Sequence, residues 1–173
     1  MLQPLASSVV LRIDYYEPED LFYIIRRSAD ILDVGINDEG AMELARRSRG
    51  TPRVANRILR RTRDYAQVKA DGYIDGNIAK IALDRLGIDK IGLDDMDRRI
   101  LSTLVEKFSG GPVGVKSLAV AIGEDATTIE DVYEPFLIKE GFMQRTSRGR
   151  VAQQTAFELL GKKVKINQQG LFK

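Results

Sequence analysis

The sequence contains no cysteine and no histidine. Disulfide bonds, thiolate zinc sites, imidazole bases and Ser-His-Asp catalysis are therefore excluded. Long apolar runs are also lacking, since uninterrupted stretches such as residues 9–11 fall far short of the roughly 20 residues that span a bilayer. No secretory signal is visible either. A cytosolic location fits these absences, and we expect no metal site and no membrane partner.

The net charge is small but unevenly placed. The 173 residues are 43% hydrophobic and carry a net charge of +2, which suits a globular chain of one large domain or two small ones. A net charge this small does not by itself indicate a polyanionic partner. Residues 46–63, however, hold eight arginines and no acid, and residues 141–173 hold seven basic residues and one acid. We expect anionic ligands at these two stretches.

Helix signals divide the first half of the chain into four segments. Prolines and capping residues such as Asn37 and Thr51 start them, and glycines such as Gly50 end them. The predicted helices cover residues 17–32, 37–48, 51–69 and 75–86. A short strand is predicted before them at residues 9–15. Because a lone strand needs a partner, this segment is either an irregular connector or part of a sheet in an absent N-terminal domain.

The second half of the chain has the order of a winged helix, in which three helices precede a hairpin. The predicted helices begin at Asp94, at Lys116 and at a possible capping box formed by Thr127 and Glu130. Pro135 lies inside the third helix and is expected to kink or split it. Two short strands are predicted at residues 142–146 and 150–153, joined by a turn at residues 147–149.

The first candidate site is the start of the third predicted helix. Arg53 lies in its first turn, where free backbone N–H groups and the helix dipole attract anions. The guanidinium can reach a terminal phosphate there, but the sequence alone favours a solvated helix face formed by this arginine and its neighbours. Residues 110–117 approach the phosphate-loop pattern, but Val115 replaces an obligatory glycine, so we do not assign a nucleotide site to them.

The second candidate site is the predicted hairpin. Arg145, Arg148 and Arg150 surround its turn, and strand alternation can place Arg145 and Arg150 side by side, where both meet a DNA backbone. The preceding helix is acidic, so we expect binding that does not depend on base sequence. Replacing Arg145 and Arg150 by alanine is expected to weaken DNA binding by roughly 1 to 3 kcal/mol and to leave the fold unchanged.

Three stretches of the chain resemble the RuvB family of AAA+ ATPases. Residues 11–21 are similar to the entry of the family's small ATPase domain, and residues 49–57, RGTPRVANR, are similar to its sensor-2 segment. The most specific stretch is residues 134–150, which begin EPFLIKEGF. The resemblance extends from Val10 to about Leu160.

This resemblance implies a mainly α fold, with an AAA+ helical lid at residues 9–93 and a winged helix DNA-binding domain at residues 94–161. A basic tail would follow at residues 162–173, and residues 1–8 would be an artificial or fused start. The implied nucleotide-binding residues are Tyr16, Pro52 and Arg53, with Arg53 as the sensor of the γ-phosphate. The implied DNA-binding residues are Arg145, Arg148 and Arg150.

The family function implied is ATP-driven branch migration of Holliday junctions, in DNA recombination, repair and the SOS response. The family works as a hexamer in the bacterial cytoplasm with RuvA and RuvC and uses ATP or ADP with Mg²⁺. The chain would correspond to the C-terminal two-thirds of such a protein, because the large ATPase domain with its phosphate loop has no counterpart here. We therefore expect no hydrolysis and no stable nucleotide binding by this chain. Ala126 replaces an arginine that relatives can carry near DNA, which predicts a reduced DNA affinity.

Two functions of other classes fit the same pattern. A transcription regulator with an effector-sensing helical domain would bind DNA selectively by sequence, whereas the RuvB resemblance implies binding that ignores sequence and weakens steeply with salt. An adaptor whose winged helix docks protein would show no DNA association even at low salt.

Overall fold

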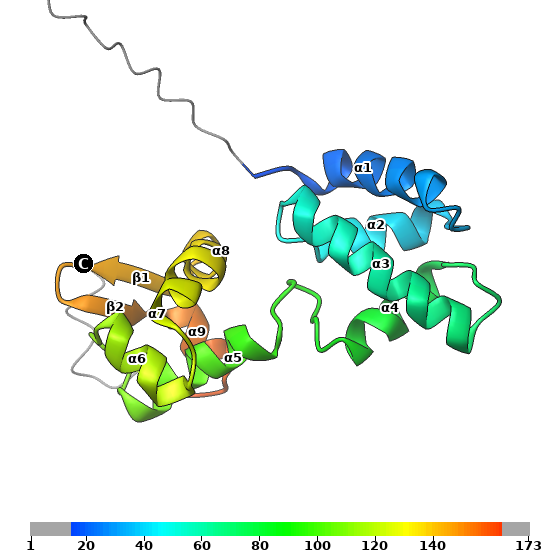
Figure 1. Cartoon of the computed structure of the whole chain (residues 1–173). Helices are drawn as coiled ribbons and strands as arrows, with labels where there is room; N and C mark the ends of the chain where they lie inside the picture. The colour runs from blue at the N-terminus through cyan, green and yellow to red at the C-terminus, as the bar shows by residue number, and fades with distance from the viewer. Residues whose placement is uncertain (1–14, 164–173) are drawn as a thin grey trace, which may run out of the picture. The chain divides into compact units, whose positions relative to one another are not determined.

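The computed structural model describes residues 15–163, in which helices predominate (Figure 1). The chain splits after Arg85 into two compact units, and each is described by itself. From the sequence we predicted that the first domain ends at residue 93, and Leu93 lies in the hydrophobic core of the second unit. No helix among residues 15–163 is long and apolar enough to cross a membrane.

The first unit consists of four helices packed against one another (Figure 1). They are α1 (Pro18–Ile31), α2 (Asp38–Arg46), α3 (Pro52–Lys69) and α4 (Gly76–Arg85). The predicted caps are present, since the side chain of Asn37 accepts from the N–H of Gly40 and that of Thr51 accepts from the N–H of Val54. All four predicted helices are thus confirmed, with ends shifted by two residues at most. The strand predicted at residues 9–15 lies outside the described residues except for Tyr15, which is not in a strand.

Arg47, the C-cap residue of α2, forms an ion pair with Asp84 of α4. Arg47 is only 3% exposed, and its guanidinium donates to Glu43 at 2.5 Å and to Asp84 at 2.9 Å. In α1, Leu21 and Ile25 are buried. The buried apolar side chains of the four helices therefore form a common core.

The second unit is a winged helix, as predicted. Its helices are α5 (Asp95–Ser102), α6 (Val115–Ile122), α7 (Ala126–Thr128), α8 (Glu134–Lys139) and α9 (Gln154–Leu159). Two π-helical turns, η1 (Thr103–Lys107) and η2 (Ile129–Tyr133), extend α5 and join α7 to α8. The wing is an antiparallel pair of strands, β1 (Met143–Thr146) and β2 (Gly149–Ala152).

Three details of this unit differ from or refine the sequence analysis. The cap of α7 is Asp125 and not the predicted capping box of Thr127 and Glu130. Hydrogen bonds from the backbone N–H groups of Thr128 and Thr127 lower the pKa of Asp125. Pro135 lies in the first turn of α8, directly after η2, so the predicted division of this helix is confirmed. The short helix α9 was not predicted.

Glycines allow the wing to approach the rest of the unit closely. Val113 forms an isolated antiparallel bridge with Arg150, which adds a third backbone segment beside β2. Gly149 has φ +131°, and a Cβ added there would lie 2.4 Å from the carbonyl oxygen of Val113. The base of the wing therefore has no room for a side chain at this position.

We expect Gly149→Ala to destabilise the second unit by about 3 kcal/mol, because it adds a steric clash to an unfavourable φ. Gly141→Ala is the matched control, since Gly141 also has a positive φ of +72° but nothing within 4 Å of an added Cβ. Its expected cost is about 1 kcal/mol. Urea unfolding of both variants measures the difference, and equal costs would contradict the close approach.

Candidate nucleotide-sensing and nucleic-acid sites

The structure brings the three predicted nucleotide residues to one end of α3. The N–H of Tyr16 donates to the carbonyl oxygen of Gly50 at 2.9 Å. Gly50 has φ +71°, and an added Cβ would lie 2.8 Å from the Cβ of Tyr15. The segment of Tyr15 and Tyr16 therefore passes directly over the loop that leads into Pro52 and Arg53. Tyr16 is 42% exposed, so its side chain is accessible there.

Arg53 lies in the first turn of α3, and its side chain is exposed. The macrodipole of this 18-residue helix and its free N–H groups add to the positive potential at that end. This combination of a helix start, a guanidinium and a nearby tyrosine can bind a phosphate group and stack or contact a base or sugar.

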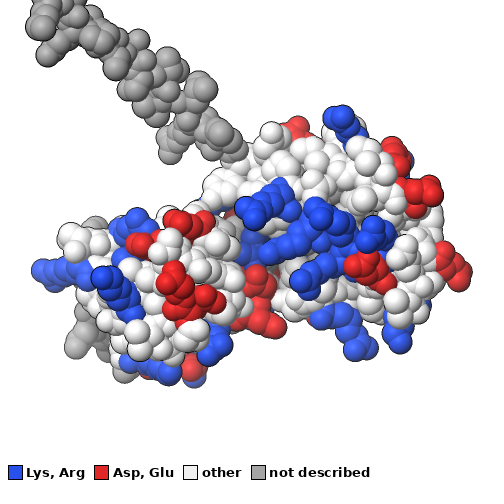
Figure 2. All heavy atoms as spheres, viewed as in Figure 1, with Lys and Arg blue, Asp and Glu red and all other residues white. Residues whose placement is uncertain are grey.

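The eight arginines of residues 46–63 do not form a single surface. Arg47 and Arg49 are buried, with 3% and 9% exposed, and Arg63 pairs with Asp64 at 2.7 Å. The exposed arginines of α3 whose side chains make no hydrogen bond or ion pair within residues 15–163 are Arg53, Arg57, Arg60 and Arg61. Their spacing places them on one helix face, and Figure 2 shows basic side chains gathered into a patch on this unit. Within residues 46–63, we therefore expect an anionic ligand only at this face of α3.

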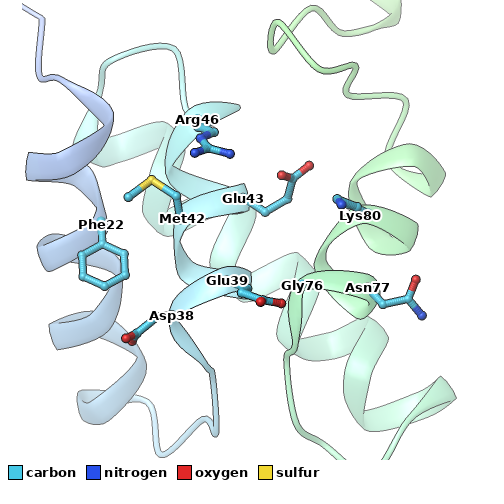
Figure 3. A pocket seen from close by; sticks show the side chains of 9 residues that line it. All are labelled: Phe22, Asp38, Glu39, Met42, Glu43, Arg46, Gly76, Asn77 and Lys80. Carbon is cyan, nitrogen blue, oxygen red and sulfur yellow. The ribbon is translucent and has the colours of Figure 1, made fainter.

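A pocket of the first unit lies away from the predicted nucleotide residues. It has a volume of 730 Å³ and is lined by residues of α1, α2 and α4 (Figure 3). Its lining holds three carboxylates and two cations, which gives a net negative charge that disfavours a polyphosphate. Neither Tyr16 nor Arg53 lines it, so we do not assign the nucleotide to this pocket.

The wing brings together the three predicted DNA-binding arginines. Arg145 on β1 and Arg150 on β2 are directly opposite each other in the strand register. Arg148 lies in the two-residue turn between the strands and is exposed. Strand alternation predicted this neighbourhood correctly.

Glu130 of η2 and Glu134 of α8 form ion pairs with Arg145 and Arg150 of the wing. Arg145 donates to the Oε2 of Glu134 from Nε at 3.1 Å and also from Nη2. Arg150 donates from Nε to the Oε1 of Glu134, and from Nη2 to Glu130 at 2.5 Å. The side chain of Glu134 is only 1% exposed, compared with 11% for Arg150 and 53% for Arg145. The hydrogen bond with Glu134 is the main cause that raises the pKa of Arg150.

Arg150 lies beside Arg145, as predicted, but it is 9% exposed. Its guanidinium is buried against the helical segment because Glu134 accepts two of its hydrogen bonds, one of them at 3.4 Å. Both glutamates belong to the helix that we interpreted as too acidic to read bases, and Glu130 was also predicted to form a capping box with Thr127. Their spacing of four residues, which places both on one helix face toward the wing, was the signal that could have revealed the pairing.

Comparisons with known proteins identify both units. A family model described as the RuvB AAA lid domain matches residues 16–89, and one described as the RuvB C-terminal winged helix domain matches residues 90–161. The class of protein is thus an AAA+ lid followed by a winged helix. The chain belongs to the RuvB family.

Solved structures of Thermotoga maritima RuvB are similar to this chain. A point variant is 44% identical, with a TM-score of 0.83, and the match covers 91% of this chain and 52% of that one. A second structure, titled the Thermotoga maritima RuvB Holliday junction branch migration motor, is also 44% identical, with a TM-score of 0.81, and the match covers 88% and 51% of the two chains. The chain thus spans about half the length of these relatives, and not the two-thirds that the sequence analysis expected.

Proposed function

We propose that this chain is the nucleotide-sensing lid and the DNA-binding winged helix of an ATP-driven motor that moves Holliday junctions during recombination and repair. The similar Thermotoga maritima protein is described as a Holliday junction branch migration motor, which supports this assignment. The observation that carries the DNA-binding role is the cluster of Arg145, Arg148 and Arg150 on one hairpin beside a helix. The proposed partners are four-way and duplex DNA, RuvA, RuvC and further copies of the chain in a hexamer.

The proposed role of the lid is to respond to ATP or ADP with Mg²⁺ held by an ATPase domain. Arg53 would contact the γ-phosphate, Tyr16 and Pro52 would contact the nucleotide, and a change in phosphate charge would shift the lid. Support comes from the convergence of these residues at the start of α3. The lid and winged helix by themselves contain no phosphate loop, so we propose that this chain alone does not hydrolyse ATP.

The proposed DNA contact is to the phosphate backbone and does not depend on base sequence. Residues 94–161 contain eight basic and eleven acidic residues, which gives a net charge of −3 (8 − 11). Figure 2 shows acidic side chains grouped on a face of this unit. The helical segment before the wing carries Glu130, Asp131 and Glu134, which makes it a poor reader of base edges, so we propose that the cationic wing is the part that contacts DNA.

A binding titration against four-way junction, duplex and single-stranded DNA at several salt concentrations tests this function. We expect affinity that is independent of base sequence and falls steeply with salt. Selective binding of one duplex sequence would favour a transcription regulator. No association even at low salt would favour a protein adaptor, and both results would contradict the proposal.

Arg148→Ala is expected to weaken duplex binding about fivefold at low salt and to lower the salt slope by about 1, because one phosphate contact is lost. Its thermal unfolding should be unchanged, since the side chain is exposed. Arg99→Ala is the matched control: it removes the same charge from an exposed position of α5, away from the wing. Equal effects of the two variants on affinity would show that only the overall charge matters.

A further inference from the structure

The four charged side chains beneath the wing form a closed group with a net charge of zero. Glu130 and Glu134 lie one helical turn apart, and Arg145 and Arg150 face them from the two strands. Every acid in the group contacts both arginines. As long as this group is closed, Arg148 is the only wing arginine without an ion pair among the described residues.

We propose that the two glutamates have opposite roles in DNA binding: Glu134 positions Arg145 and Arg150 toward a phosphate, whereas Glu130 occupies the place of that phosphate and must be displaced. This inference rests on the proposed function of the wing in DNA binding. Glu134 would then be a positioning residue, and Glu130 a residue that competes with DNA for the wing arginines.

The contacts of Glu134 are those of a positioning residue. Its carboxylate accepts from the Nε and Nη2 atoms of both arginines, so both guanidiniums turn the same edge toward α8. Neither Nη1 atom has a partner within residues 15–163, so a phosphate that replaces Glu130 beside the two Nη2 atoms can also accept from the adjacent Nη1 groups. Because Glu134 is almost completely buried, these pairs are weakly screened and hold the two side chains firmly.

The contacts of Glu130 are those of a phosphate substitute. One oxygen of its carboxylate lies between the two guanidiniums, 2.5 Å from the Nη2 of Arg150 and 3.5 Å from the Nη2 of Arg145. Carboxylates and phosphates are recognised by arginine with similar geometry. Glu130 is 37% exposed, so its pairs are screened by solvent and its side chain can rotate away at low cost. Its departure changes the net charge of the group from zero to +1.

The test compares three variants of the full chain that each remove one negative charge from the same helical segment. Glu130→Gln is expected to tighten duplex binding about fivefold, because the competing anion is gone, and Glu134→Gln to weaken it about tenfold, because both arginines lose their orientation. Asp131→Asn is the control, since Asp131 is exposed and lies between the two glutamates in sequence. It should tighten binding less than twofold at about 0.15 M salt, where exposed charges are well screened.

Fluorescence anisotropy with a labelled duplex gives the affinities, and thermal unfolding shows whether each variant is folded. A second readout is Glu134→Gln in an Arg145→Ala background, where its effect on affinity should shrink because one of the arginines it positions is absent. If Glu134→Gln does not fold, the comparison of Glu130→Gln with Asp131→Asn still decides the role of Glu130.

The outcomes separate the inference from the function on which it rests. If the unsubstituted chain does not bind DNA at low salt, the proposed function fails. If that chain binds but Glu130→Gln and Asp131→Asn shift the affinity equally, the competing role is overturned. If Glu134→Gln folds and tightens binding like the other two variants, the positioning role is overturned and only general electrostatics remains.

Discussion

Arg150→Ala is expected to lower the free energy of unfolding of the winged helix by about 3 to 5 kcal/mol. The substitution removes the partner of a carboxylate that is only 1% exposed, so Glu134 keeps a buried charge with Arg145 as its remaining described cation. The substitution also removes the ion pairs that connect β2 to Glu130 and Glu134. An unpaired buried charge of this kind is among the few mechanisms that produce so large an effect.

Chemical denaturation followed by circular dichroism measures this loss, and Arg148→Ala is the control from the same hairpin. Hydrogen exchange of the β1 and β2 amides localises the loss to the wing. This result would revise the expectation that Arg145 and Arg150 can both be removed without effect on the fold. Stability equal to that of Arg148→Ala would show that the ion pairs contribute little. For DNA-binding studies, Arg145→Ala is the cleaner variant because its side chain is 53% exposed.

Arg53→Ala is expected to reduce ATP turnover about 100-fold once these residues are joined to the ATPase domain of a RuvB relative. The guanidinium lies at the positive end of α3, and its loss removes a charge that can stabilise the transferring phosphate. Steady-state phosphate release by such a chimera measures the effect. The binding of ATP should weaken much less than turnover, because a phosphate sensor acts mainly as charge develops.

Arg57→Ala provides the control for this experiment. Arg57 lies one turn further along the same exposed face of α3 but beyond the first turn, where the field of the helix end has fallen off. We expect turnover within about twofold of the unsubstituted chimera. Normal hydrolysis by the Arg53→Ala chimera would show that Arg53 is a surface arginine with no part in sensing.

Local signals predicted most of the helices of both units. A proline in the first turn and the cap at Thr51 give α3 the bounds that were expected, and the turn around Arg148 marks the wing. These features depend on residues a few positions apart, where capping and turn chemistry act. The short helix α9 lacked such a signal, since no side chain caps its start.

The interactions that could not be predicted are those between segments distant in the sequence. Glu134 and Arg150 are sixteen residues apart, and their pairing depends on how α8 packs against the hairpin. The contact of Tyr16 with Gly50 is likewise a tertiary one, so Tyr16 alone resembles an ordinary strand residue. The roles proposed for Tyr16, Pro52 and Arg53 come from the family resemblance. The structure shows that these three residues lie together at the start of α3.

The hydrogen bond between Tyr16 and Gly50 connects the first described residues to the start of α3. The helix has 18 residues and is therefore about 27 Å long. A turn of about 10° around its first residues moves its far end by about 5 Å. Because α3 packs against α1, α2 and α4, such a reorientation at the arginine end would turn the four helices together and displace Lys69 with them.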